Sequence, residues 1–145
     1  MSVKLTLLRH GETKANRENL VLGTSDVGLT NLGKCQAHAS ALRISNLGPD
    51  AIYTSPYTRA VETAQYISRL TGLNPNPMTG LQEMDSGEME GTDAKRMGEL
   101  FPEYMARWEK DASTTRPPGG ETLGEVHSRA WKSALAIAHL HKNEH

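Results

Sequence analysis

The residues with the clearest chemical potential are an arginine and a histidine that follow an apolar run. In LTLLRHGETKAN, Arg9, His10 and Gly11 come at the point where a short strand would end. A third basic side chain, Arg59, falls in the first turn of a helix expected after a second strand. A guanidinium group can bind a phosphate through two parallel hydrogen bonds. Glycine lets the backbone approach a ligand without a Cβ in the way. These residue types favour a phosphate site.

A histidine between two guanidinium groups can also react. Neutral imidazole is a nucleophile, and nearby positive charge favours the neutral form. The alcohol released by attack on phosphorus needs a proton, and GLQEMDSGEMEG offers Glu83 and Glu88 as carboxyl groups. A bound phosphate would favour the protonated form of either carboxyl, as a general acid requires. The residues predict phosphoryl transfer through His10, with Glu83 and Glu88 as alternative proton sources.

Two strand–helix units must position these side chains. Residues 3–8 and 51–54 are short apolar runs that predict buried strands. The helix between them is expected to begin after Thr30 as N-cap and to end at Gly48. The Ser-Pro pair at 55–56 predicts the start of the next helix. Parallel strands bring their carboxyl ends to one edge of a sheet, where ligands bind.

The rest of the chain predicts more helix than strand. A short strand is expected near 78–84, helical segments over 94–110, and a final helix opened by a capping box from Thr122 to Glu125. In the helix after Thr30, a spacing of three to four residues predicts a buried face, made of Leu32, Cys35, Ala39 and Leu42. Strands and helices in alternation predict an α/β three-layer sandwich with a mostly parallel sheet.

Composition narrows the classes of function. The 145 residues carry a formal net charge of −1, and 23% of them are charged, so no general attraction to nucleic acid or membrane is expected. A single cysteine excludes an internal disulfide and favours a cytoplasmic location. The start of the chain has too short an apolar run for a secretory signal. Residues 1–145 are expected to form one domain.

Taken together, the motifs resemble a known family. LLRHGETKAN, YTSPYTRAVETA, LQEMDSGEMEG and PPGGET occur in the order and approximate spacing of the histidine phosphatase (phosphoglycerate mutase-like) superfamily. The resemblance implies the α/β fold and a phosphorylated nucleophile, His10, with Glu83 as proton donor and acceptor. It also implies a phosphate- and substrate-binding set, which consists of Arg9, Gly11, Asn16, Gly23 and Arg59.

The resemblance further implies a small phosphorylated metabolite as substrate and no metal or cofactor. The segment LQEMDSGEMEG is similar to the phosphatase branch and lacks the E-R-H-Y type of segment usual in mutases. A metal-independent phosphomonoester hydrolase is therefore expected, with a mutase or an inactive phosphate-binding relative as alternatives. The oligomeric state stays open, and a homodimer is one possibility.

One departure from the family pattern concerns a second catalytic histidine. Members carry it in a strand that ends in His-Gly after the last helix seen here, and none of His127, His139, His141 and His145 is followed by glycine. We expect the domain to be C-terminally incomplete, with one or more strands of the sheet missing. Without such a partner, residues 3–8 would expose an unpaired apolar edge, and activity would be doubtful.

Overall fold

The computed structural model describes residues 3–141. Its strands are β1 (Ile52–Thr54) and β2 (Pro75–Pro77). Its α-helices are α1 (Lys14–Arg17), α2 (Asn31–Ser45), α3 (Thr58–Thr71), α4 (Met97–Leu100), α5 (Pro102–Trp108) and α6 (Leu123–Leu140). Short 3₁₀ helices are η1 (Thr79–Leu81), η2 (Gly87–Met89) and η3 (Ala94–Arg96).

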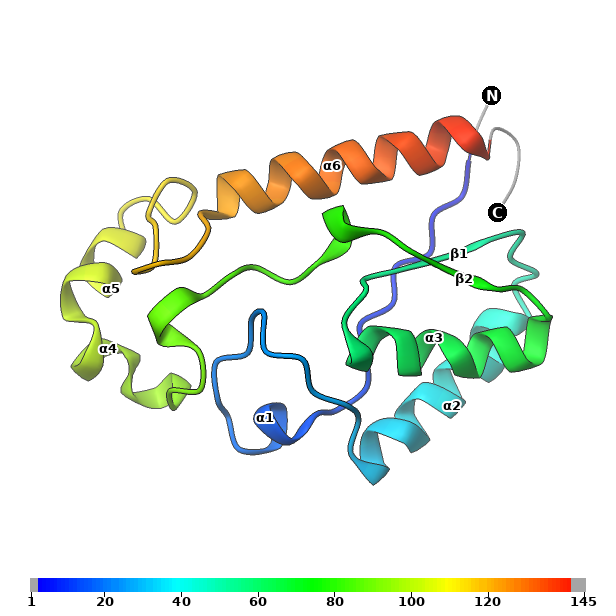
Figure 1. Cartoon of the computed structure of the whole chain (residues 1–145), viewed down its shortest axis with the longest axis horizontal. Coiled ribbons are helices and arrows are strands. Elements are labelled where there is room, and N and C mark those ends of the chain that lie inside the picture. Colours follow the sequence, from blue (N-terminus) through cyan, green and yellow to red (C-terminus); the bar gives the residue numbers. More distant parts are fainter. Residues whose placement is uncertain (1–2, 142–145) are drawn as a thin grey trace.

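The described chain has the predicted α/β architecture with a parallel sheet. β1 pairs with β2 in parallel, with Ile52 opposite Pro75 and Thr54 opposite Pro77. The two strands lie between α6 on one side and the pair α2 and α3 on the other (Figure 1). The short strand expected near 78–84 lies earlier in the chain, as β2, and ends at Pro77, because the chain turns into η1 directly after it.

Residues 3–8 do not form the predicted buried strand. They run as an extended segment from near the C-terminal end of α6 toward α1 (Figure 1), and they are not paired as a strand. Leu7 is 93% exposed, and Leu5 and Leu8 are 48% and 41% exposed. A strand needs a neighbouring strand for its backbone groups and a covered face for its side chains. Within residues 3–141 this segment has neither.

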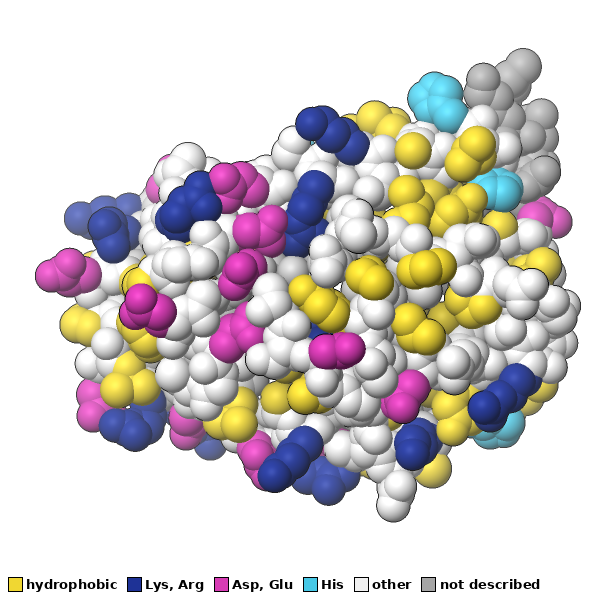
Figure 2. Space-filling model, viewed as in Figure 1, with side chains coloured by type: hydrophobic (Ala, Val, Ile, Leu, Met, Phe, Trp, Pro, Cys, Tyr) yellow, Lys and Arg dark blue, Asp and Glu magenta, His cyan; other side chains and the backbone are white. Residues whose placement is uncertain are grey.

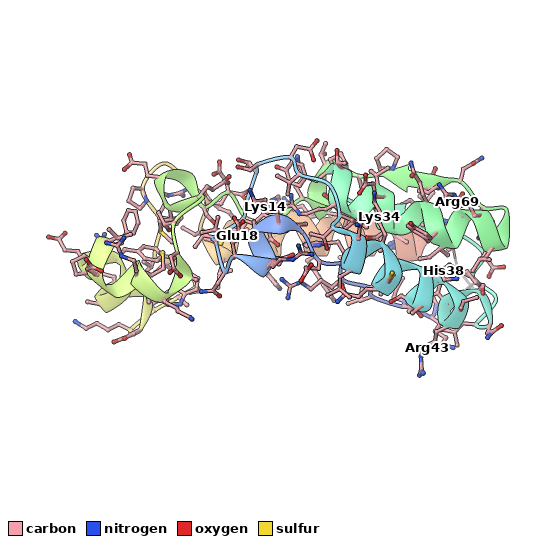
Figure 3. All side chains as sticks on the ribbon, turned by 90° about the horizontal axis from the view of Figure 1, so that it is seen from below. Lys14, Glu18, Lys34, His38, Arg43 and Arg69 are labelled. Carbon is pink, nitrogen blue, oxygen red and sulfur yellow. The ribbon has the colours of Figure 1, made fainter. Side chains whose placement is uncertain are left out.

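The helix begun by Thr30 is confirmed, but its buried face is not the predicted one. The Thr30 hydroxyl caps α2 by accepting from the Gly33 N–H at 3.0 Å. The predicted residues Leu32, Cys35, Ala39 and Leu42 are all exposed, and the buried residues are Gly33, Ala37 and Ala41. Small side chains let α2 pack closely on α3, which lies beside it in Figure 3. Close approach, rather than bulk, selects the buried face here.

Helix α3 begins two residues later than the Ser-Pro pair predicts. Its N-cap is Tyr57, whose side chain makes no cap bond. The cap comes from the 23–26 loop: the Asp26 carboxylate accepts from the Thr58 N–H at 2.6 Å and from the Thr58 hydroxyl at 2.9 Å. A carboxylate at a helix N-terminus also interacts well with the helix dipole. A loop from another part of the chain therefore replaces the local cap.

Two apolar clusters support these elements. Ala41, Ile52, Ala64 and Ile67 form one between α2, β1 and α3. A second, formed by Met89, Met97 and Tyr104, supports the region of η2, α4 and α5. The helical segments expected over 94–110 are present as η3, α4 and α5, and the predicted capping box of α6 is formed.

Candidate functional site

The main candidate site is a cavity of about 490 Å³ beside the end of β1. Its lining contains four sequence-predicted residues: Arg9, His10, Arg59 and Glu83. Glu88, the other candidate proton source, does not line it. The rest of the wall is largely apolar, and includes residues 3–8, β1 and the α6 side chains Ala134 and Ile137. Hydrophobic side chains gather below α6 on the face shown in Figure 2.

The His10 imidazole is fixed by the backbone next to it. Its Nδ1 lies 2.7 Å from the Gly11 carbonyl oxygen. A carbonyl can only accept, so the neutral imidazole making this bond carries its proton on Nδ1 and keeps the lone pair on Nε2. Burial lowers the pKa of His10 below its ordinary 6.5, and the charges of Arg59 and Arg9 lower it further. The bond to Gly11 and the charge of Glu83 oppose this shift without reversing it.

Arg59 is a buried cation that holds a loop. It is 2% exposed, and its Nη1 and Nη2 donate to the carbonyl oxygens of Ser25 (2.9 Å) and Gly23 (2.8 Å). Its guanidinium carbon also lies 4.7 Å from the centre of the Tyr57 ring. Each Nη carries a second N–H, so the group keeps donors for an anion. Two of the donors predicted to bind phosphate are nevertheless used to fix the loop.

Glu90 holds the same loop from the other side. Its carboxylate accepts from the backbone N–H and the hydroxyl of both Thr24 and Ser25. Burial alone would raise the pKa of Glu90, but these hydrogen bonds outweigh it and lower the pKa. Sequence reasoning missed this residue, because Glu90 stands in an acidic segment and its partners are 65 and 66 residues away.

The predicted ligands Gly11 and Asn16 have structural partners. The Gly11 N–H donates to the Thr63 hydroxyl at 3.1 Å, and a Cβ on Gly11 would collide with the Gly33 backbone. The lack of a Cβ at Gly11 therefore allows close packing against α2. The Asn16 side-chain oxygen accepts from the Thr13 N–H and hydroxyl, both at 3.0 Å, in the capping box of α1. Neither Gly11, Asn16 nor Gly23 lines the cavity.

Glu83 is exposed and lies at the edge of the cavity. One carboxylate oxygen accepts from the Met84 N–H at 2.9 Å, and its backbone carbonyl accepts from Arg129 at 3.0 Å. The charge of Glu83 acts on His10. The cavity thus brings together an imidazole, a carboxyl group and two guanidinium groups from three separate parts of the chain.

Over residues 3–141, no three or more His, Cys, Asp or Glu side chains are grouped so as to hold a metal ion. None of the described helices is both long and apolar enough to cross a membrane.

A family model described as histidine phosphatase superfamily (branch 1) matches residues 5–145. The chain belongs to this superfamily. Among curated proteins, the 2,3-bisphosphoglycerate-dependent phosphoglycerate mutase of Bartonella quintana is 32% identical over 136 residues, which cover 90% of this chain and 66% of that protein. The chain therefore spans about two thirds of the length of the phosphoglycerate mutases it matches.

Solved structures of the superfamily are similar in fold. A mycobacterial glucosyl-3-phosphoglycerate phosphatase, solved as a complex with VO3, superposes with a TM-score of 0.82 at 29% identity. The match covers 92% of this chain and 66% of that one. The α-ribazole phosphatase of Shigella flexneri matches with a TM-score of 0.81 at 25% identity and the same coverage. Phosphatases and mutases both occur among the relatives, so the superfamily is one of phosphoryl-handling enzymes.

Proposed function

We propose that this histidine phosphatase superfamily member hydrolyses phosphomonoesters without a metal, through a phosphohistidine on His10. The observation that carries the proposal is the shared cavity of His10, Arg9, Arg59 and Glu83, in which the His10 Nδ1 is held by the Gly11 carbonyl. A fixed Nδ1–H leaves Nε2 as the nucleophile.

In the first step, the Nε2 lone pair forms a bond to phosphorus, and the P–O bond to the alcohol breaks. The alcohol oxygen takes the proton of the Glu83 carboxylic acid. In the second step, water attacks the phosphohistidine, the Glu83 carboxylate takes a proton from this water, and the P–N bond breaks. Arg9 and Arg59 balance the charge on the transferring group, as guanidinium groups do in other phosphoryl transfers.

The lowered pKa of His10 supports the proposal. An imidazole that is neutral at a given pH is ready to attack, and burial together with the charges of Arg59 and Arg9 favours this state. The segment around Glu83 also resembles the phosphatase branch. The substrate proposed is a small phosphorylated metabolite.

A second candidate is transfer of the phosphoryl group to a second hydroxyl, as in a mutase. The specific observation that favours it is the 32% identity to a 2,3-bisphosphoglycerate-dependent phosphoglycerate mutase. The two candidates share the phosphohistidine and differ in the acceptor. A hydrolase releases the phosphoryl group as inorganic phosphate, whereas a mutase transfers it to a hydroxyl of an organic molecule.

The test is brief exposure of the full chain to a ³²P-labelled phosphomonoester, followed by acid quenching and peptide mapping. We expect acid-labile label on His10, release of inorganic phosphate, and no loss of turnover with a chelator. His10→Ala should abolish both label and turnover. His38→Ala, at an exposed histidine of α2, is the matched control and should change neither. Undiminished turnover in His10→Ala would overturn the proposal. Label on His10 without release of inorganic phosphate would favour the mutase, and neither label nor turnover in the wild type would favour the inactive relative.

A further inference from the structure

Arg129, on α6, donates hydrogen bonds both to the segment that carries Glu83 and to Glu121. Nη1 donates to the carbonyl oxygens of Gly80 (3.1 Å) and Gln82 (2.7 Å), and Nη2 donates to that of Glu83 (3.0 Å). Nε and Nη2 donate to the two carboxylate oxygens of Glu121, at 2.9 and 2.8 Å. A guanidinium has five N–H groups. Each of the five is therefore used, three of them on the carbonyl groups of residues 80, 82 and 83.

Glu121 holds the C-terminal end of this segment, at Asp85. Its carboxylate accepts from the Asp85 N–H at 3.1 Å, and its own N–H donates to the Asp85 carbonyl at 2.8 Å. Hydrogen bonds from Arg129 are the largest cause of the lowered pKa of Glu121, so the carboxylate stays ionised. Residues 80–85 are thus held from both ends by one ion pair.

The Glu83 side chain depends on this backbone support. Its carboxylate is exposed, and the hydrogen bond that it accepts comes from its neighbour Met84. A bond to the next residue moves with the backbone and does not anchor the group to the rest of the fold. The position of the carboxyl group therefore follows the position of residues 80–85.

We propose that Arg129 is a positioning residue for Glu83, acting through the carbonyl groups of residues 80, 82 and 83. This inference rests on the proposed function, because it assigns Arg129 a part in proton delivery. A general acid must lie within hydrogen-bond reach of the leaving oxygen, and a shift of about 1 Å in a reacting group costs on the order of 10²-fold in rate. Arg129 keeps that shift small.

The leaving group gives a readout that a merely structural role would not move. An alkyl alcohol must receive the Glu83 proton as its P–O bond breaks, whereas p-nitrophenol departs as a stable anion without it. Misplacing the acid should therefore slow the alkyl ester much more than the aryl ester. A general loss of structure would slow both alike.

The experiment compares Arg129→Ala and Arg129→Lys with the wild type of the full chain on glycerol phosphate and on p-nitrophenyl phosphate. For both variants we expect kcat/KM, which covers the steps up to departure of the alcohol, to fall by about 10- to 100-fold for glycerol phosphate and by less than about 3-fold for p-nitrophenyl phosphate. The later hydrolysis of the phosphohistidine is common to both esters and does not enter this comparison. Lysine should not rescue, since it cannot supply the planar set of donors. Glu83→Gln should show the same difference between the two esters. The double variant that also carries Arg129→Ala should differ little from Glu83→Gln alone.

Arg116→Ala is the matched control. Arg116 donates to the Gly120 carbonyl and to Glu125, which places it in the same region but on other partners. In this variant the rates of hydrolysis of both esters should fall only slightly and to the same extent. Equal losses for the two esters in the Arg129 variants would overturn the inference.

Backbone amide exchange separates failure of this inference from failure of the proposed function. A wild type that turns over neither ester and takes no label on His10 overturns the proposed function. Amide exchange at Gln82 and Asp85 then tests, without any turnover, whether Arg129 holds residues 80–85 in place. Faster exchange in Arg129→Lys, but not in Arg116→Ala, supports its hold on the Glu83 segment, and unchanged exchange overturns it.

Discussion

The two sides of His10 are held in opposite ways. After it, the chain enters what we call the polar corner, which comprises residues 11–26 together with Arg59 and Glu90. Thr13 there is fully buried, and the N–H groups of Gly11, Glu12 and Thr13 donate to side chains. Before it, residues 3–8 are extended, and Leu7 is 93% exposed.

The difference shows what each kind of segment needs. Polar backbone groups in a loop can be satisfied one at a time, by single side chains such as Thr63 or Glu90. An apolar strand needs a whole partner strand and a covered face, and single contacts cannot replace them. The corner is therefore complete within the described residues, whereas the segment before His10 is not.

Removal of the Arg59 guanidinium should have the largest effect on the polar corner. Arg59→Met leaves the buried carbonyl group of Gly23 and the partly buried one of Ser25 without this donor, which we expect to cost about 2–4 kcal/mol of unfolding free energy. Urea denaturation measures it. Arg69→Met is the control on the same helix, since Arg69 is exposed on α3 (Figure 3). Its guanidinium lies over the Tyr66 ring, and its removal should change stability by less than about 0.5 kcal/mol. Equal effects of the two variants would break the comparison.

Glu90→Gln should weaken the corner by about 1–2 kcal/mol, because the amide replaces one charged acceptor oxygen by a donor. The pKa of Glu90 is lowered from 4.5 in the folded chain, so its stabilisation is present above pH 4.5 and is lost as the pH falls through the lowered value. The variant should lack this part of the acid dependence of stability. Glu88→Gln, at an exposed carboxylate, should keep it. Identical pH profiles of stability for the wild type and Glu90→Gln would contradict the role of the carboxylate.

His10 lies where the two regions meet, and its titration reports on both. Because its pKa is lowered, the neutral nucleophile should persist below pH 6.5, and kcat/KM should fall only as the pH drops through the lowered value. Arg9→Gln removes one charge that lowers this pKa, so the acid limb of kcat/KM should move to higher pH. A pH–rate profile of both proteins measures the shift. An acid limb that moves to lower pH in Arg9→Gln would be inconsistent with this electrostatic account.

The smallest effect on stability is expected for a substitution in residues 3–8, the segment before His10. Leu7→Ala should change the unfolding free energy by less than about 0.5 kcal/mol, because the side chain is already in water. Ile67→Ala, in the cluster with Ala41, Ile52 and Ala64, is the contrast and should cost about 2–5 kcal/mol. Thermal or urea denaturation of the two variants compares them. A loss above about 2 kcal/mol in Leu7→Ala would show that the side chain is covered in solution.

The sequence predicted local structure correctly where the interacting residues are near one another in the chain. The Thr122–Glu125 capping box and the Thr30 cap of α2 each depend on contacts within a few residues. The motifs around His10, Arg59 and Glu83 also identified the family, since they combine rare residue types in a fixed order. Short-range geometry follows directly from residue type and spacing.

Only the tertiary structure decided which distant groups meet. Asp26 caps α3, Glu90 holds Thr24 and Ser25, and Arg129 holds residues 80–83, each across a long stretch of chain. The buried face of α2 was likewise set by the closeness of α3 and not by hydrophobic spacing. A charged or small residue looks alike in sequence whether it is solvated or buried. Its role depends on which partner the fold brings within hydrogen-bond or packing distance.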